Sequence, residues 1–148
     1  MLPDLIAEKL TVIFCGINPG LKSAEEGHHF SGRSNRFWKV LHQAGFTPHE
    51  IAPINDKTIV SFGYGLTTAV ARATNRADEL KKEEFANAIE AFKTKMTLYN
   101  PKYIAFLLFS QIHPPSIMQS DMLPLSMIKG CINIIRLAGR SGCILRWI

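Results

Sequence analysis

Apolar residues in the first part of the chain fall into short continuous runs and into repeats at helical spacing. Residues 10–17 form a β-rich apolar run bounded by Gly16 and Pro19, which predicts a strand buried on both faces. Further short strands are predicted at residues 65–70 and 102–109. Because helical patterns separate these runs, the order favours an α/β fold with a parallel sheet.

The helix that follows the first strand is predicted from four apolar residues on one face: Phe37, Val40, Leu41 and Ala44. Ser34 is a suitable N-cap for it, and Gly45 is a suitable stop. The Gly-, Ser- and His-rich segment that leads up to Ser34 is expected to be a loop.

A second helix is predicted at residues 82–99, where four apolar residues share one face: Phe85, Ile89, Phe92 and Met96. Acidic residues come early in this segment, Lys93 and Lys95 come late, and Asn100-Pro101 ends the pattern. Residues 73–81, just before it, are predicted to form a surface loop.

Length and composition describe one soluble domain over residues 1–148. We expect no membrane-spanning helix and no secretory signal, and therefore a cytoplasmic protein. The three cysteines form no CxxC pair, which favours reduced thiols and argues against a bound metal. The net charge of +5 favours a polyanionic partner without identifying one.

Residues 107–148 differ in composition from the rest of the chain. They contain a single acidic residue, Asp121, together with four basic ones: Lys129, Arg136, Arg140 and Arg146. Their secondary structure stays open at this stage.

The segment Gly16-Ile-Asn-Pro-Gly20 places a polar amide, Asn18, where the first strand ends. Ligands of open parallel sheets bind beyond the carboxyl ends of the strands. Pro19 fixes φ and removes a donor, and Gly16 and Gly20 let a ligand approach the backbone closely. By itself, however, the segment is more typical of an ordinary turn, because Asn, Pro and Gly are common turn residues.

Several motifs in a fixed order make the segment more specific. They are Gly16-Ile-Asn-Pro-Gly-Leu21, Gly27-His-His-Phe30, Asn35-Arg-Phe-Trp-Lys39, Gly45-Phe46, Tyr64-Gly-Leu-Thr-Thr68 and Tyr99-Asn-Pro-Lys-Tyr-Ile-Ala105. Together they cover residues 10–106, and this part of the chain resembles the mismatch-specific uracil and thymine DNA glycosylases of the uracil-DNA glycosylase superfamily.

The resemblance implies a three-layer α/β/α sandwich with a short, mainly parallel central sheet. It also implies a base excision repair enzyme that flips uracil, and in some members thymine, out of G·U or G·T mismatches in double-stranded DNA. The enzyme then hydrolyses the N-glycosidic bond. We expect a monomer without a cofactor.

Site residues follow from the same resemblance. Asn18 matches the residue that orients the attacking water, Ile17 and Gly20 lie beside the base, and Phe30 matches the aromatic residue that stacks on it. Arg36 and Lys39 are candidates for phosphate contacts. Because an amide is too weak a base to take a proton from water, the reaction is expected to depend on the leaving group, with backbone N–H groups of residues 16–21 stabilising its charge.

Two observations keep alternatives open. His28 and His29 are more consistent with a loop surface than with a metal site, and Phe30 and Phe37 are also ordinary core residues. The tail contains neither the Gly-Lys turn nor the Asn-Pro-Ser-Gly-like wedging loop of related enzymes, and Gly139-Arg-Ser-Gly142 is a poor substitute. We therefore hypothesise that the tail is truncated or out of frame. The alternatives to an active glycosylase are a catalytically impaired DNA-binding relative or an unstable product. A further alternative is a small-molecule binder that uses the Asn18 loop to bind an anion.

Overall fold

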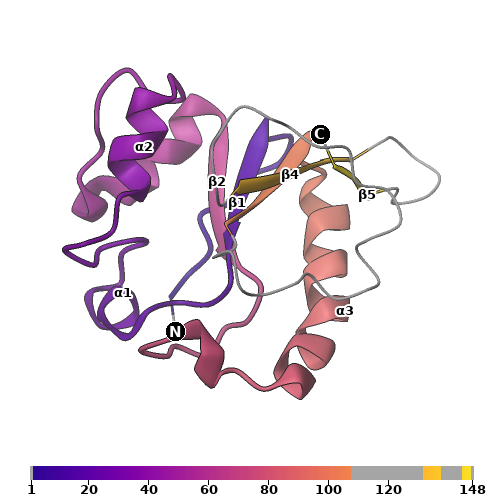
Figure 1. Cartoon of the computed structure of the whole chain (residues 1–148). Helices are drawn as coiled ribbons and strands as arrows, with labels where there is room; N and C mark the ends of the chain where they lie inside the picture. Colours follow the sequence, from indigo (N-terminus) through magenta and orange to yellow (C-terminus); the bar gives the residue numbers. More distant parts are fainter. Residues whose placement is uncertain (1, 108–131, 138–144, 148) are drawn as a thin grey trace.

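A computed structural model of the chain describes residues 2–107, 132–137 and 145–147 (Figure 1). Its centre is a sheet in the order β2-β1-β3-β4-β5. The strands are β1 (Val12–Gly16), β2 (Tyr64–Thr68), β3 (Tyr103–Leu107), β4 (Ile132–Leu137) and β5 (Leu145–Trp147). The first three are parallel to one another, whereas β4 is antiparallel to β3 and β5 is antiparallel to β4.

The parallel part of the sheet brings three strand ends to one edge. Gly16 at the end of β1 is in register with Thr68 on one side and with Leu107 on the other. Because carboxyl ends of parallel strands point the same way, the segments that follow β1 and β2 leave the sheet as neighbours. This edge carries Asn18.

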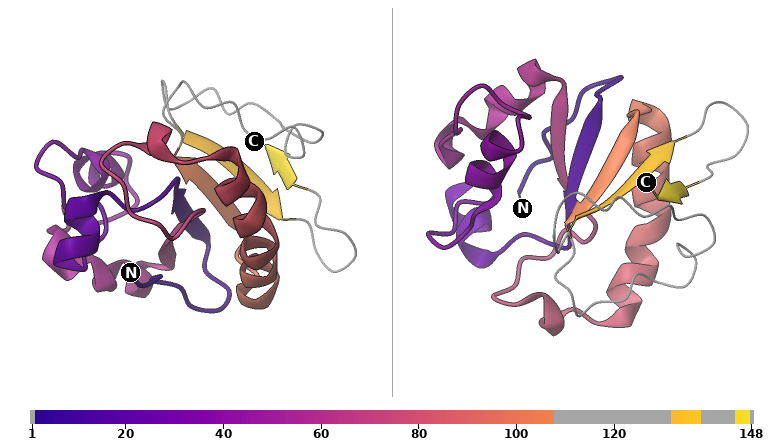
Figure 2. Two further views of the ribbon diagram at one scale, coloured as in Figure 1. Left: turned by 90° about the horizontal axis from the view of Figure 1, so that it is seen from below. Right: turned by 45° about the horizontal axis from the view of Figure 1, so that its top comes forward.

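Helical segments cover both faces of the sheet (Figures 1 and 2). One face is covered by α1 (Leu21–Glu26), α2 (Phe37–Gln43) and the 3₁₀ segment η1 (Pro53–Phe62), and the other by α3 (Lys82–Tyr99). A short 3₁₀ turn, η2 (Ala77–Glu79), precedes α3. The predicted three-layer α/β fold is thereby confirmed. Among the described helices, none is long and apolar enough to cross a bilayer.

Side chains of β1 alternate between two apolar clusters, one under each layer. Ile13 and Cys15 pack with Met96 on the α3 side, whereas Phe14 packs with Trp38 on the α2 side. All five residues of β1 are buried, as predicted for a strand covered on both faces. This strand therefore holds its final residues, and the loop behind them, in a fixed place.

Helix α3 has the predicted bounds, residues 82–99, but the start of α2 differs from the prediction. Ser34 does not cap α2. Instead, Asn35 Oδ1 accepts the Phe37 N–H at 2.9 Å. Asn35 therefore ties the loop to the start of the helix, as an Asx turn does. On α2 the buried residues are Trp38 and Leu41, while Val40 is exposed.

The helical segments α1 and η1 are not predicted by the pattern of apolar residues. Helix α1 is only six residues long and begins with an exposed leucine, Leu21, so it shows little apolar periodicity. The η1 segment has 3₁₀ geometry with about three residues per turn, which a search for helical spacing of 3.6 passes over. The predicted strand positions 108 and 109, the segment 139–142, Cys131 and Cys143 lie outside the described residues.

Candidate active site

Asn18 lies just beyond β1, half-buried, and its carboxamide has a defined orientation. The Nδ2 group donates to the backbone carbonyl of Arg72 at 2.8 Å and to Thr74 Oγ1 at 2.7 Å. A carbonyl can only accept, so nitrogen rather than oxygen must face Arg72. Within residues 2–107 no group donates to Asn18 Oδ1, which therefore remains available as an acceptor.

Thr74 is held by hydrogen bonds of its own. Its hydroxyl donates to the Arg76 carbonyl at 2.8 Å, which leaves its lone pairs for the Asn18 amide. Thr74 is buried even though it lies in the predicted surface loop. No local pattern predicts this contact, because Thr74 lies 56 positions from Asn18 along the chain.

The loop after β1 is paired with the segment after β2. The Ile17 carbonyl accepts the Val70 N–H at 2.9 Å, the Pro19 carbonyl accepts the Thr74 N–H at 3.1 Å, and the Leu21 N–H donates to the Thr74 carbonyl at 3.1 Å. These bonds continue the sheet's parallel pairing beyond its strands. The loop is therefore rigidly placed before any ligand arrives.

This pairing determines which backbone N–H groups of the loop are available to bind a ligand. The Leu21 N–H is already engaged, whereas no acceptor in the described part of the chain receives the N–H groups of Ile17, Asn18 or Gly20. The Ile17 side chain is buried, but a Cβ added to Gly20 would meet no described atom within 4 Å. There is therefore open space beside the Gly20 backbone.

Phe30 lies at the same end of β1. Its ring stacks on Phe37 with centroids 4.0 Å apart and planes 26° from parallel. A Cβ built on Gly16 would lie 3.9 Å from the Phe30 ring, so the ring borders the end of the strand. Its φ of 55° is left-handed, an uncommon value for a residue that is not glycine. Such backbone strain is often found at ligand sites.

The neighbouring residue His29 explains how this conformation is held. Its N–H donates to Asp56 Oδ2 at 2.8 Å, its carbonyl accepts the Trp38 indole N–H at 3.1 Å, and its Nε2–H donates to the Pro3 carbonyl at 2.9 Å. Asp56 is itself buried. The prediction that both histidines lie on a loop surface is therefore wrong for His29, which is 3% exposed.

Two buried titratable groups near the site, His29 and Cys15, are uncharged at neutral pH. Burial lowers the pKa of His29, so its imidazole is neutral at pH 7 and serves as a donor to Pro3. Burial likewise raises the pKa of the Cys15 thiol well above its usual range, which keeps it protonated and unreactive. Among the described residues, no three His, Cys, Asp or Glu side chains gather as metal ligands would.

Arg36 and Lys39 are exposed at the first turn of α2, where Arg36 is the N-cap residue. Three positions apart at the start of a helix, the two residues lie on neighbouring parts of one surface. The structure thus leaves both cations accessible to solvent, and their assignment to phosphate stays a prediction.

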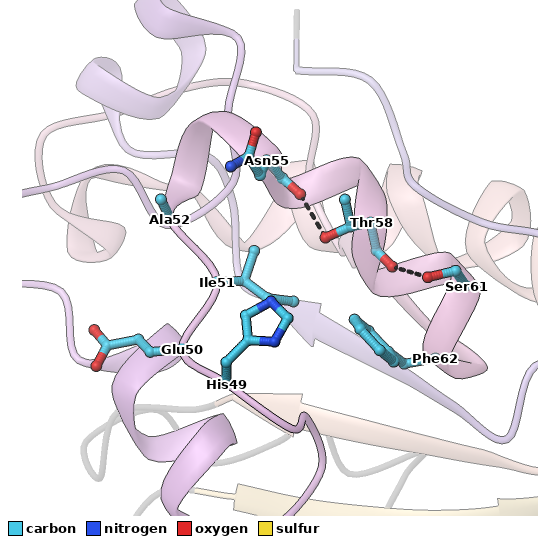
Figure 3. Close-up of a pocket in the computed structure, with 8 residues that line it drawn as sticks. All are labelled: His49, Glu50, Ile51, Ala52, Asn55, Thr58, Ser61 and Phe62. Carbon is cyan, nitrogen blue, oxygen red and sulfur yellow. Dashed lines mark hydrogen bonds between the residues drawn. The ribbon is translucent and has the colours of Figure 1, made fainter.

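A hollow of about 390 Å³ occurs elsewhere in the described part of the chain, along η1 (Figure 3). It is lined by His49, Glu50, Ile51, Ala52, Asn55, Thr58, Ser61 and Phe62. The Thr58 and Ser61 hydroxyls that line it donate to the backbone carbonyls of Asn55 and Thr58. No predicted site residue contributes to its wall, so it is separate from the Asn18 loop.

Comparison with known protein families places the candidate site within a family match. Residues 3–128 match the model of the uracil DNA glycosylase superfamily. The matched region includes the Asn18 loop, the Phe30 loop and the segment that binds the Asn18 amide.

Proposed function

The chain belongs to the uracil DNA glycosylase superfamily, and on that premise we propose that it removes uracil from G·U mismatches in double-stranded DNA by hydrolysing the N-glycosidic bond. Thymine in G·T mismatches is the second substrate to be tested. The observation that supports the proposal is the fixed Asn18 carboxamide, whose nitrogen is bound to Arg72 and Thr74 and whose oxygen is unoccupied by described residues.

Asn18 Oδ1 orients the attacking water. As an acceptor, it takes a hydrogen bond from water and turns an oxygen lone pair toward the sugar carbon. It cannot deprotonate that water at neutral pH, so bond breaking to the base runs ahead of water attack. The positive charge that develops on the sugar then makes a neutral water a sufficient nucleophile.

Negative charge on the departing pyrimidine is stabilised by the loop backbone. The N–H groups of Ile17, Asn18 and Gly20 are the donors not engaged elsewhere in the described structure. Prearranged donors of this kind act on developing charge without having to reorganise. The space beside Gly20 lets the base approach these groups.

Phe30 provides the stacking surface for the flipped base. One face of its ring is supported by Phe37, so a pyrimidine on the other face extends an existing aromatic stack. Flipping a mispaired base costs less than flipping a Watson–Crick paired one, which favours mismatched substrates. Arg36 and Lys39 would hold the duplex through phosphates, independently of sequence.

The test is single-turnover base release from duplexes that contain G·U, G·T or a normal A·T pair. We expect release from G·U, and a loss of about 100-fold or more in Asn18→Ala with little change in duplex affinity. Asn75→Ala is the matched control, because Asn75 is an exposed asparagine near the same segment. Excision that persists in Asn18→Ala would refute the role of this amide. Duplex binding without base release by the wild-type protein would instead identify an impaired DNA-binding relative.

A further inference from the structure

Arg72 connects the candidate nucleophile-binding residue to helix α3. Its backbone carbonyl accepts the Asn18 Nδ2–H, while its side chain reaches Glu84 in the first turn of α3. We propose that Arg72 and Glu84 form a positioning pair, which sets the orientation of the Asn18 carboxamide through the Arg72 backbone. This inference rests on the proposed function and assigns the pair no contact with the substrate.

The geometry between the two side chains is that of a two-point clamp. Arg72 Nε lies 2.6 Å from Glu84 Oε1, and Arg72 Nη2 lies 3.0 Å from Glu84 Oε2. The same Nη2 also donates to the Glu79 carbonyl at 3.0 Å. A planar guanidinium bound at two points by a carboxylate has little freedom to rotate.

Glu84 is a firm anchor for this clamp. Its Oε2 also accepts the Lys81 N–H at 2.9 Å, so the carboxylate is fixed to the helix start as well as to Arg72. The Arg72 guanidinium and the Lys81 N–H together hold the pKa of Glu84 at about 2, and the carboxylate is ionised at neutral pH. Arg72 lies in no helix or strand, and its neighbours Val70 and Thr74 are bonded to the loop after β1. The clamp adds a connection from Arg72 to α3, at a point of the segment where the backbone pairing with that loop is interrupted.

An exposed arginine near a DNA-binding site also invites a different reading, in which Arg72 binds a phosphate. The Glu84 carboxylate argues against it, because it accepts from both donors of the Nε–Nη2 edge of the guanidinium and offsets its charge locally. The two readings predict opposite results for Glu84→Gln. A positioning role predicts slower base release at unchanged duplex affinity, whereas a phosphate role predicts tighter duplex binding once the competing carboxylate is removed.

The experiment compares Glu84→Gln with Glu90→Gln, which breaks another exposed ion pair of α3, that of Glu90 and Lys93. We expect the rate of single-turnover base release from a G·U duplex to fall about tenfold in Glu84→Gln. This loss is smaller than the loss of about 100-fold that a 1 Å misplacement of a reacting group can cause. Duplex affinity and its salt dependence should match wild type, and Glu90→Gln should change neither quantity. The double variant Arg72→Met/Glu84→Gln should release base no more slowly than Arg72→Met, because the pair acts as one unit.

A second readout does not depend on catalysis. In the ¹H–¹⁵N spectrum, the Asn18 side-chain amide is identified by its absence from Asn18→Ala. Its hydrogen exchange should become about fivefold faster in Glu84→Gln and stay unchanged in Glu90→Gln. Unchanged exchange in Glu84→Gln, or tighter duplex binding, would overturn the positioning role. A wild-type protein that releases no base would overturn the proposed function alone, since the exchange measurement still tests the pair.

Discussion

Replacement of Asp56 tests how the Phe30 loop is held. Asp56 is 1% exposed and accepts the His29 N–H at 2.8 Å. In Asp56→Ala this N–H stays buried and loses its charged acceptor, which costs about 1–3 kcal/mol of unfolding free energy. The other contact of the carboxylate, to His28 Nδ1, is long at 3.5 Å, so it adds little.

Asp56→Asn separates the hydrogen bond from the charge. Its amide oxygen can still accept the His29 N–H, and only the difference between a charged and a neutral acceptor is lost, which is about 1 kcal/mol. The order of stability should therefore be wild type, then Asp56→Asn, then Asp56→Ala. Asp78→Ala is the control, because Asp78 is an exposed aspartate in a surface ion pair and should change stability by less than about 0.5 kcal/mol.

Urea denaturation followed by circular dichroism measures the stabilities, and base release measures the effect on the site. Without Asp56 one of the three hydrogen bonds that hold His29 is lost, and the left-handed conformation of Phe30 is held less firmly. Asp56→Ala should therefore weaken base binding as well as the fold. Asp56→Ala with the stability of wild type within about 0.5 kcal/mol would refute this account of the loop. A stability loss with unaltered binding of the flipped base would show that Phe30 does not depend on His29.

Further changes probe single features of the site and sheet. Gly20→Ala should leave stability unchanged, since its Cβ meets no described atom within 4 Å, but should slow base release by obstructing the approach of the base. Gly65→Ala should lower the unfolding free energy by about 1–3 kcal/mol in urea, because its Cβ would lie 2.9 Å from the Leu5 carbonyl oxygen; wild-type stability would contradict that packing. Arg36→Ala should reduce the salt slope of duplex binding by about 1, and an unchanged slope would remove this residue from the interface. The pKa of Glu84 lies below its ordinary value, at about 2, so its stabilising contribution is complete above about pH 4.5 and is lost as the pH falls toward 2; thermal melts between pH 5 and pH 2 should show a smaller drop in Glu84→Gln than in wild type.

The parts of the fold that were predicted correctly carry strong local signals. The apolar run of β1 and the apolar periodicity and end signals of α3 each predict the element from one continuous segment. The segments α1 and η1 carry no such signal, since one is a single short helix and the other has 3₁₀ geometry. Local pattern is therefore sufficient for the three parallel strands and for helix α3, but not for β4 and β5 or for the layer that shapes the Phe30 loop.

The candidate site, too, is predicted only in part from the sequence. A strand end followed by Asn18 is visible in the sequence, but the groups that bind its amide lie 54 and 56 positions away. Asp56 is similarly 27 positions from the residue that it holds. Neither a short polar loop nor a lone aspartate carries a periodicity that would reveal these contacts, because they arise only when β1 and β2 become neighbours.

The two halves of the candidate site are held by different layers of the sandwich. Asn18 is bound by the segment that leads to α3, whereas Phe30 depends on Asp56 of η1 and on Phe37 of α2. Strand β1 is common to both, through its buried side chains and Gly16. Damage to one layer should consequently impair one step, water positioning or base stacking, before it unfolds the other. Under the proposed function, activity requires both layers to be docked on β1 at the same time, which is a stricter condition than the presence of the motif around Asn18.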